Sequence, residues 1–265
     1  MDIRILGPVE AEENGCSVVP VAGKPRRMLA LLAVNAGRFV PVGALAEELW
    51  GGAPPRSAAT TLQTYVLGLR TLVDAAGGRG GKEVLVTAPG GYRLDVDPDD
   101  VDAVRFERAA RAGHRASDLG DHEAAARLLR AALALWRGPV LVDVQVGAQL
   151  GPEVTRLEEG RTRALEDRIG ADLRLGRHHA LLGELAVLRG RHPMHENLCA
   201  IHMVALYRCG RPWQALDAYT TLRTALVAEL GMEPAPRLRR LQHLVLASDP
   251  ELEFTGGPDR LAAPA

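Results

Sequence analysis

The sequence has few of the features that mark secreted, membrane-bound or disulfide-stabilised proteins. Aromatic residues make up 4% of the chain, and its three cysteines, Cys16, Cys199 and Cys209, form no close pair. An odd number of separated thiols excludes a disulfide framework and fits a reducing compartment. No apolar run approaches the roughly 18 residues that cross a membrane, and no charged leader precedes an apolar segment at the N-terminus. We therefore expect a soluble cytoplasmic protein without membrane contact.

Catalytic motifs are also lacking. The segment GGRGGKE at residues 77–83 is rich in glycine, but its spacing is not that of a phosphate-binding loop, and Glu83 stands where Ser or Thr must bind magnesium. No GxSxG, HExxH, GxGxxG or paired CxxC motif occurs. We interpret residues 77–83 as a flexible link, and we expect neither enzyme activity nor a cofactor.

One expected helix carries residue types that bind metals. His195, Cys199, His202 and Cys209 share a face at helical spacing. A metal needs ligands that converge on one point, yet Cys209 lies more than two turns from Cys199, and Gly210 ends the helix. We therefore favour a packed core face over a metal site and expect no metal.

Charge is balanced over the whole chain but not along it. The net charge is −1, so no global excess points to a polyanionic partner. Residues 24–93 nevertheless contain nine lysines and arginines against four acidic residues, an excess of five positive charges. A basic segment of this kind is typical of a nucleic-acid contact.

The N-terminal segment predicts a small sheet followed by two helices. The expected elements are strand-like runs at 3–5 and 18–21 around a polar stretch at 10–17, a helix at 24–36, a short strand at 39–40 and a helix at 42–50. Lys24, Arg26 and Arg27 crowd the first turn of the first helix, where cations oppose the helix dipole. This placement indicates nearby phosphates or carboxylates, although a solvated helix end has the same pattern.

A longer helix is expected from Pro54 to Ala75, with Ser57 as its N-cap. Its apolar positions gather on one side, and its other side holds no carboxylate, which is unusual for a solvated face and indicates a polyanion close by. A helix packed on both sides within a domain is the alternative. The apolar side comprises Ala58, Leu62, Tyr65, Val66, Leu69, Leu72 and Val73, and the other side Ser57, Thr60, Gln63, Thr64, Leu67, Gly68 and Thr71.

A hairpin is expected after this helix. Residues 84–87 and 92–96 alternate in strand fashion around Ala88-Pro89-Gly90-Gly91, and we expect a Gly-Gly tip with Arg93 near it. Two helices joined by a turn and followed by a hairpin predict a winged helix-turn-helix. We assign it to residues 1–97 as a DNA-binding domain.

The remaining chain predicts an all-α repeat domain over residues 98–249. Turns centred on Gly120, Gly176 and Gly210 recur, and the last two are 34 residues apart, the period of tetratricopeptide repeats. The fold class is therefore mainly α with a small α+β domain. Residues 250–265 are expected to form a flexible tail. Expected inward residues of a late helix are Ala215, Leu216, Tyr219, Leu222, Leu226 and Leu230.

Several segments resemble one family. PPRSAATTLQTYVLGLRTLV and APGGYRLDV are similar to the OmpR-type winged helix of the Streptomyces antibiotic regulatory proteins (SARP family). RLEEGRTRALEDRIGADLRLGRH, RHPMHENL, ALYRCGRPWQALDAY and LVAELGMEPAPRLRRL resemble the bacterial transcriptional activation domain that accompanies it. The chain departs from the usual pattern at His195, where Arg is common, and at Gly68.

The resemblance implies a transcriptional activator of a gene cluster for an antibiotic or other secondary metabolite. It further implies binding to direct repeats in double-stranded promoter DNA as a side-by-side, head-to-tail homodimer. RNA polymerase, including its sigma factor, would be the protein partner, and the protein would be associated with the nucleoid.

Residue chemistry predicts how such a protein contacts DNA. Short hydroxyls and an amide can read base edges, a leucine can meet thymine methyls, and cations bind phosphates or the minor groove. The expected base-reading residues are Thr60, Gln63, Thr64, Leu67 and Thr71, and the expected backbone or minor-groove residues are Lys24, Arg26, Arg27, Arg56, Ser57, Arg70 and Arg93. The alternative is a helical-repeat adaptor whose winged domain binds protein instead of DNA.

Overall fold

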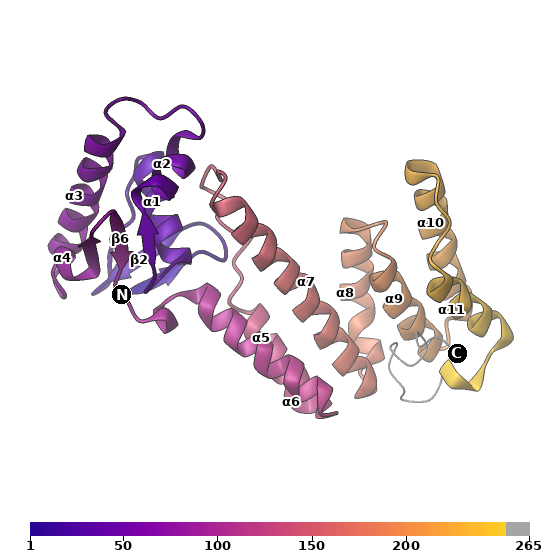
Figure 1. Ribbon diagram of the computed structural model, residues 1–265. Coiled ribbons are helices and arrows are strands. Elements are labelled where there is room, and N and C mark those ends of the chain that lie inside the picture. Colours follow the sequence, from indigo (N-terminus) through magenta and orange to yellow (C-terminus); the bar gives the residue numbers. More distant parts are fainter. Residues whose placement is uncertain (253–265) are drawn as a thin grey trace. The chain divides into compact units, whose positions relative to one another are not determined.

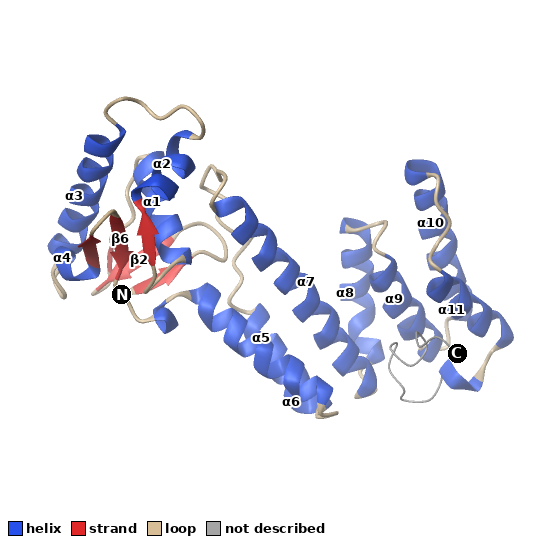
Figure 2. Ribbon diagram, viewed as in Figure 1, coloured by secondary structure: helices blue, strands red, loops and turns tan. Residues whose placement is uncertain are grey.

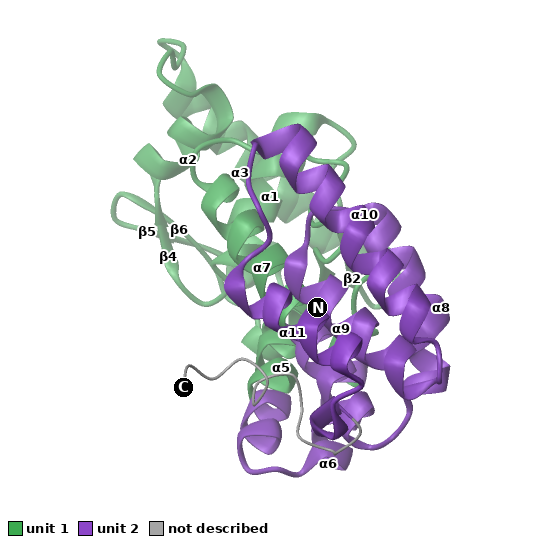
Figure 3. Ribbon diagram, turned by 90° about the vertical axis from the view of Figure 1, so that its right-hand side faces the viewer, with its two compact units in different colours: residues 1–111, 131–163 green, residues 112–130, 164–265 purple. Residues whose placement is uncertain are grey.

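The computed structural model describes residues 1–252 and contains two compact units (Figures 1 and 3). Unit 1 comprises residues 1–111 and 131–163, and unit 2 comprises residues 112–130 and 164–265. Most of the expected tail, residues 253–265, lies outside the described residues. No helix among residues 1–252 combines the length and the apolar character that a bilayer span requires.

Unit 1 contains two small antiparallel sheets, drawn in red in Figure 2. The first has the order β1-β2-β3 and the second the order β4-β6-β5. Both sheets lie in the N-terminal part of the chain, in agreement with the expected fold class. The strands are β1 (Asp2–Arg4), β2 (Glu10–Glu13), β3 (Cys16–Ser17), β4 (Phe39–Pro41), β5 (Leu85–Ala88) and β6 (Gly91–Leu94).

The first sheet corrects the expectation that residues 10–17 only separate two strands. Glu10–Glu13 is the central strand, with Ala11 buried and Arg4 opposite Glu10. The guanidinium of Arg4 pairs with Glu10 at 3.1 Å and with Glu12 at 2.9 Å. Cross-strand ion pairs of this kind allow a strand rich in glutamate to form, which a search for apolar alternation misses.

The helices of unit 1 follow the predicted pattern closely. They include α1 (Gly23–Val34), α2 (Val42–Trp50), α3 (Ala58–Ala76) and the short α4 (Gly81–Val84). The helix α4 corrects the expectation of a flexible link at 77–83. Gly81 donates its N–H to Asp74 at 2.6 Å, and a Cβ at Gly81 would collide with the carbonyl of Arg70. The glycine therefore permits a close contact with α3.

The rest of the chain is helical, with turns where the glycine pattern places them. Gly120, Gly176 and Gly210 have φ angles of 78°, 73° and 71°, a left-handed conformation that glycine adopts readily at helix ends. The remaining elements are η1 (Pro98–Asp100), α5 (Asp102–Asp118), α6 (His122–Leu133), α7 (Leu150–Arg174), α8 (His178–Arg191), α9 (Glu196–Arg208), α10 (Pro212–Leu230), α11 (Pro236–Ala247) and η2 (Pro250–Leu252).

The helix α10 buries most of its expected inward residues. Ala215, Tyr219, Leu222 and Leu226 belong to a core cluster that α9 and α11 complete, and Leu216 packs against it. Leu230 is an exception, because it is the last residue of α10 and its side chain is 56% exposed. At a helix end the neighbouring helices no longer cover the apolar stripe.

A buried carboxylate joins the helix-turn-helix to the start of α7. Glu48 of α2 is 1% exposed and accepts N–H bonds from Gly147 at 2.6 Å, Gln149 at 2.8 Å and Leu150 at 3.0 Å. These donors lie at the N-terminus of α7, where N–H groups have no intrahelical acceptor. Glu48 therefore acts as an N-terminal cap supplied from a hundred residues away.

A second buried carboxylate holds the N-terminal strand region. Asp102 at the start of α5 accepts N–H bonds from Ile5 at 2.8 Å and Leu6 at 3.0 Å. Burial raises the pKa of Asp102, and these N–H bonds oppose the shift. Residues 1–97 therefore pack together with residues 98–111 and 131–163 in unit 1. The functional boundary at residue 97 stays a prediction.

We expect Glu48→Ala to lower the free energy of unfolding by about 3 kcal/mol, because it leaves three N–H groups without an acceptor. Urea unfolding followed by circular dichroism measures the change. Glu47→Ala is the matched control, since Glu47 is exposed and bonds only the side chain of Gln149, at 2.6 Å. The control should change stability by less than about 1 kcal/mol. Equal effects of the two substitutions would contradict the assigned role.

Candidate nucleic-acid interface

The helix α3 has one buried and one exposed face, as its sequence predicts. Leu62, Val66, Leu69 and Val73 are buried. The five expected base-reading residues are all exposed, and Leu67 presents 64% of its surface. The alternative of a helix packed on both sides within unit 1 is therefore excluded for the described residues. The five exposed residues, Thr60, Gln63, Thr64, Leu67 and Thr71, are called the reading face below.

The hydroxyls of the reading face are oriented by the helix itself. Thr64 Oγ1 donates to the carbonyl of Thr60 at 3.1 Å, and Thr71 Oγ1 donates to that of Leu67 at 3.0 Å. Each hydroxyl then keeps its acceptor lone pairs. Gly68 leaves open space beside these groups, since a Cβ there would meet nothing within 4 Å. This arrangement can accept hydrogen bonds and contact apolar groups.

Arg70 fastens α3 to the hairpin. Its Nε and Nη2 donate to the carbonyl of Leu85 at 3.0 and 2.6 Å, and Nη2 also donates to Thr87 Oγ1 at 2.8 Å. We therefore reassign Arg70 from a phosphate contact to a residue that positions α3 against β5. The reading face and the hairpin thus have a fixed relation within unit 1.

The hairpin has a different tip from the one expected. Ala88 pairs with Gly91, so Pro89 and Gly90 form the turn, and Gly90 has a φ of 81°. A proline followed by a residue with positive φ is the pattern of a type II turn. Gly91 belongs to β6, where a Cβ would collide with the carbonyl of Val40.

Arg93 lies in the middle of β6, not at the tip. It is opposite Phe39 of β4 and Val86 of β5, is exposed, and pairs with Asp95 at 3.3 Å. Arg38 directly precedes β4 and is also exposed. Sequence analysis missed Arg38 as a candidate, because only the pairing of β4 with β6 brings it to the hairpin sheet.

The basic residues of α1 have protein partners. Arg26 pairs with Asp143 at 2.9 Å and donates to the carbonyl of Pro20 at 3.1 Å. Arg27 is 8% exposed and donates to the carbonyl of Glu48 at 2.8 Å. We reassign Arg27 to the support of α2, since a buried guanidinium is not available to a phosphate. The basic first turn of α1 was expected to lie near phosphates or carboxylates, and Asp143 is such a carboxylate.

Three expected backbone contacts remain accessible. Lys24 is exposed, with its Nζ 5.3 Å from the ring centroid of Trp50. Arg56 is exposed and has no ion-pair or hydrogen-bond partner within residues 1–252. Ser57 occupies the N-cap position of α3, but its side chain makes no capping bond, which corrects the expected cap. Its hydroxyl is exposed at the start of α3.

The histidines and cysteines at helical spacing around α9 are partly packed, as the preferred core interpretation predicts. Cys199 is fully buried and donates to the carbonyl of Ala218 at 3.5 Å, and burial raises its pKa to about 11. Burial and the nearby guanidinium of Arg189 lower the pKa of His202 to about 4. His195 accepts the N–H of Leu198 at the start of α9. These three side chains therefore have structural partners.

Comparison with known proteins finds two family models that match successive parts of the chain. Residues 17–94 match the family model described as "Transcriptional regulatory protein, C terminal", and residues 101–246 match "Bacterial transcriptional activator domain". Regulatory protein DnrI of Streptomyces peucetius is 53% identical over 97% of this chain and 96% of its own length. Transcriptional regulator RedD of Streptomyces coelicolor is 38% identical over 96% of this chain and 72% of its own length.

A solved structure has the same fold. Mycobacterium tuberculosis EmbR, determined in complex with a low affinity phosphopeptide, is 35% identical and superposes with a TM-score of 0.87. The match covers 98% of this chain and 69% of that one. A shared winged helix, a shared activator domain and these identities lead to one assignment: the chain belongs to the SARP family of transcriptional regulators.

Proposed function

We propose that this protein activates transcription by binding promoter DNA through the reading face of α3. The observation that carries the proposal is the exposed reading face of α3, which bears hydroxyls, an amide and a leucine. Asp74, the carboxylate at the same helical spacing, lies in the last turn of α3 and accepts the N–H of Gly81. A major groove presents hydrogen-bond donors, acceptors and thymine methyl groups, which match these side chains. The B-DNA groove is about 12 Å wide and admits one α-helix.

Cations around the reading face would fix its register on the duplex. Arg56 and Ser57 lie at the N-terminal end of α3, where backbone N–H groups also favour phosphate. Arg93 lies on β6 and Arg38 directly precedes β4, and both would contact the backbone or the minor groove. Lys24 would add a phosphate contact. Arg26 would contribute only if its pair with Asp143 opened.

The family supplies the biological setting of the proposal. We propose that two protomers bind direct repeats head to tail, that they recruit RNA polymerase through its sigma factor, and that the regulated genes form a secondary-metabolite cluster. The resemblance to SARP regulators and the 53% identity to regulatory protein DnrI support this setting. An adaptor without DNA affinity is the rival function, and the experiments below distinguish it.

Thr64→Val should weaken binding to the preferred site by about 1–3 kcal/mol and relax its specificity, because a base-edge acceptor is lost. Competition binding against a random duplex measures both effects. Thr220→Val is the matched control, since Thr220 is also exposed and donates to the carbonyl four residues earlier, at 3.0 Å. Each variant loses an equivalent bond from a threonine hydroxyl to the carbonyl four residues earlier. Equal losses on specific and random DNA for Thr64→Val would refute the reading-face assignment.

Arg56→Ala should weaken binding to all sequences alike and reduce the slope of log affinity against log salt by about 0.9. Fluorescence anisotropy at several salt concentrations measures the slope. Arg223→Ala serves as control, because Arg223 lies in unit 2 and pairs with Glu233 at 2.5 Å. An unchanged slope in Arg56→Ala would remove Arg56 from the interface.

Footprinting on promoters adjacent to the gene should reveal two protected direct repeats separated by about one helical turn, roughly 10.5 base pairs. An inverted repeat would instead indicate a two-fold dimer. Binding without salt dependence, or no binding to any duplex, would favour the adaptor function.

A further inference from the structure

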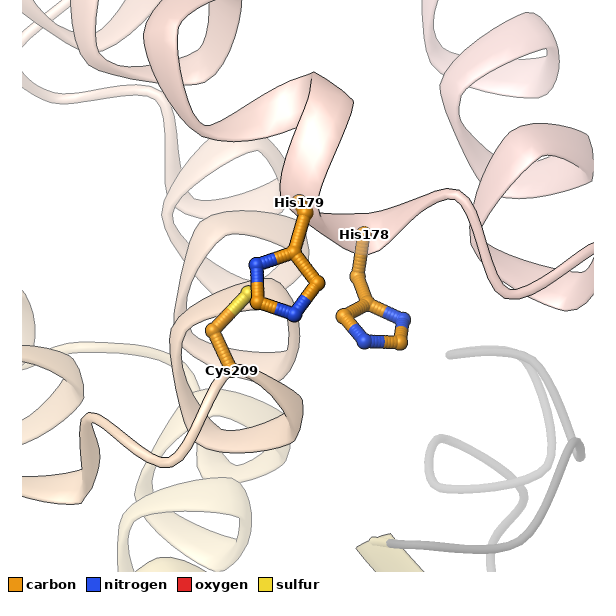
Figure 4. A group of neighbouring side chains, drawn as sticks. All are labelled: His178, His179 and Cys209. Atoms are coloured by element: carbon orange, nitrogen blue, oxygen red, sulfur yellow. The ribbon is translucent and has the colours of Figure 1, made fainter.

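Two neighbouring turns of unit 2 bring three metal-binding side chains together. His178 and His179 begin α8, and Cys209 directly follows α9. One ligand atom from each residue lies within 4.8 Å of those of the other two, and Figure 4 shows the imidazole of His179 beside the thiol. Sequence analysis considered only the α9 face and therefore missed the two histidines.

The repeat architecture explains why these residues meet. Gly176 and Gly210 occupy equivalent turns of successive helix pairs, and equivalent turns of stacked repeats lie at the same end of the stack. His178 follows the first glycine and Cys209 precedes the second. The first turn thus supplies two imidazoles and the next supplies a thiol. The 34-residue spacing of the two glycine turns, together with the adjacent His178 and His179, was the sequence signal that could have indicated this cluster.

The three side chains are available as ligands. The Nδ1 atom of His178 is buried and has no hydrogen-bond partner, while His179 is exposed. Cys209 is a half-buried free thiol.

We propose that His178, His179 and Cys209 bind one Zn²⁺ or a similar late first-row divalent cation. Two imidazoles and one thiolate are ligands that such cations prefer over carboxylate oxygen. Tetrahedral Zn–N bonds of about 2.0–2.1 Å and a Zn–S bond of about 2.3 Å place ligand atoms roughly 3.3–3.6 Å apart. Side-chain rotations that shorten these distances by up to roughly 1.5 Å would bring the ligand atoms to this spacing. A fourth position would remain for water or another ligand.

The bound cation would link the start of α8 to the end of α9. Because the ligands come from two successive turns, the metal would stabilise the helical stack against local opening. The proposal concerns unit 2 alone and does not depend on DNA binding.

Titration of the metal-free full chain with Co²⁺ tests the proposal. We expect one equivalent to bind with a thiolate-to-cobalt charge-transfer absorption, and Zn²⁺ to displace it while millimolar Mg²⁺ does not. Cys209→Ser should abolish the absorption, and His179→Gln should weaken Co²⁺ binding by roughly 10- to 100-fold or more. His179 is exposed, so its replacement should leave folding intact.

Cys16→Ser is the matched control, because Cys16 is the exposed thiol of unit 1 and should leave the absorption unchanged. Zn²⁺ should also raise the melting temperature of the wild-type chain and of Cys16→Ser, but not that of Cys209→Ser. Absence of saturable Co²⁺ binding would overturn the proposal. So would an absorption that survives in Cys209→Ser or disappears in Cys16→Ser.

Discussion

The carboxylate of Glu48 is the contact on which the geometry of unit 1 depends. It accepts three N–H groups at the start of α7, and the carbonyl of the same residue accepts the guanidinium of Arg27 from α1. One residue of α2 thereby fixes three helices at once. A carboxylate buried to this degree is stable only when donors surround it, so the segment before α7 and the helix-turn-helix must form together.

The reading face depends on this support because recognition of a groove needs a helix held at a defined angle. Inner residues such as Leu62 and Val66 hold α3 against the core, and Arg70 fixes it to the hairpin. Arg26, Arg27 and Arg70, which the sequence pattern assigned to DNA, instead contact other parts of unit 1. The outer face carries mainly small polar groups that a polyanion can approach, and the carboxylate of its last turn, Asp74, accepts the N–H of Gly81.

Local signals predicted the elements of the fold well. Proline and glycine delimit α2, whose bounds were predicted to the residue, and the apolar stripe of α3 was recognised for the same reason. Long-range contacts were not predictable. Arg26 and Arg27 are residues of the type that binds phosphate. The partner of Arg26 is Asp143, which lies far away in the sequence, and the partner of Arg27 is the backbone carbonyl of Glu48, which no side-chain pattern reveals. Likewise, His178 meets Cys209 only through repeat stacking.

The bond between Glu48 and residues 147–150 also limits how such regulators can be recombined. The family match for the winged helix ends at residue 94 and that for the activator domain begins at residue 101, which makes the intervening linker an obvious crossover point. A crossover there would separate Glu48 from Gly147, where even a Cβ would collide with Glu48. A chimera of two relatives would therefore remain well packed only if both parents kept a carboxylate and a glycine at these positions. Packing thus favours keeping the two segments together as one block.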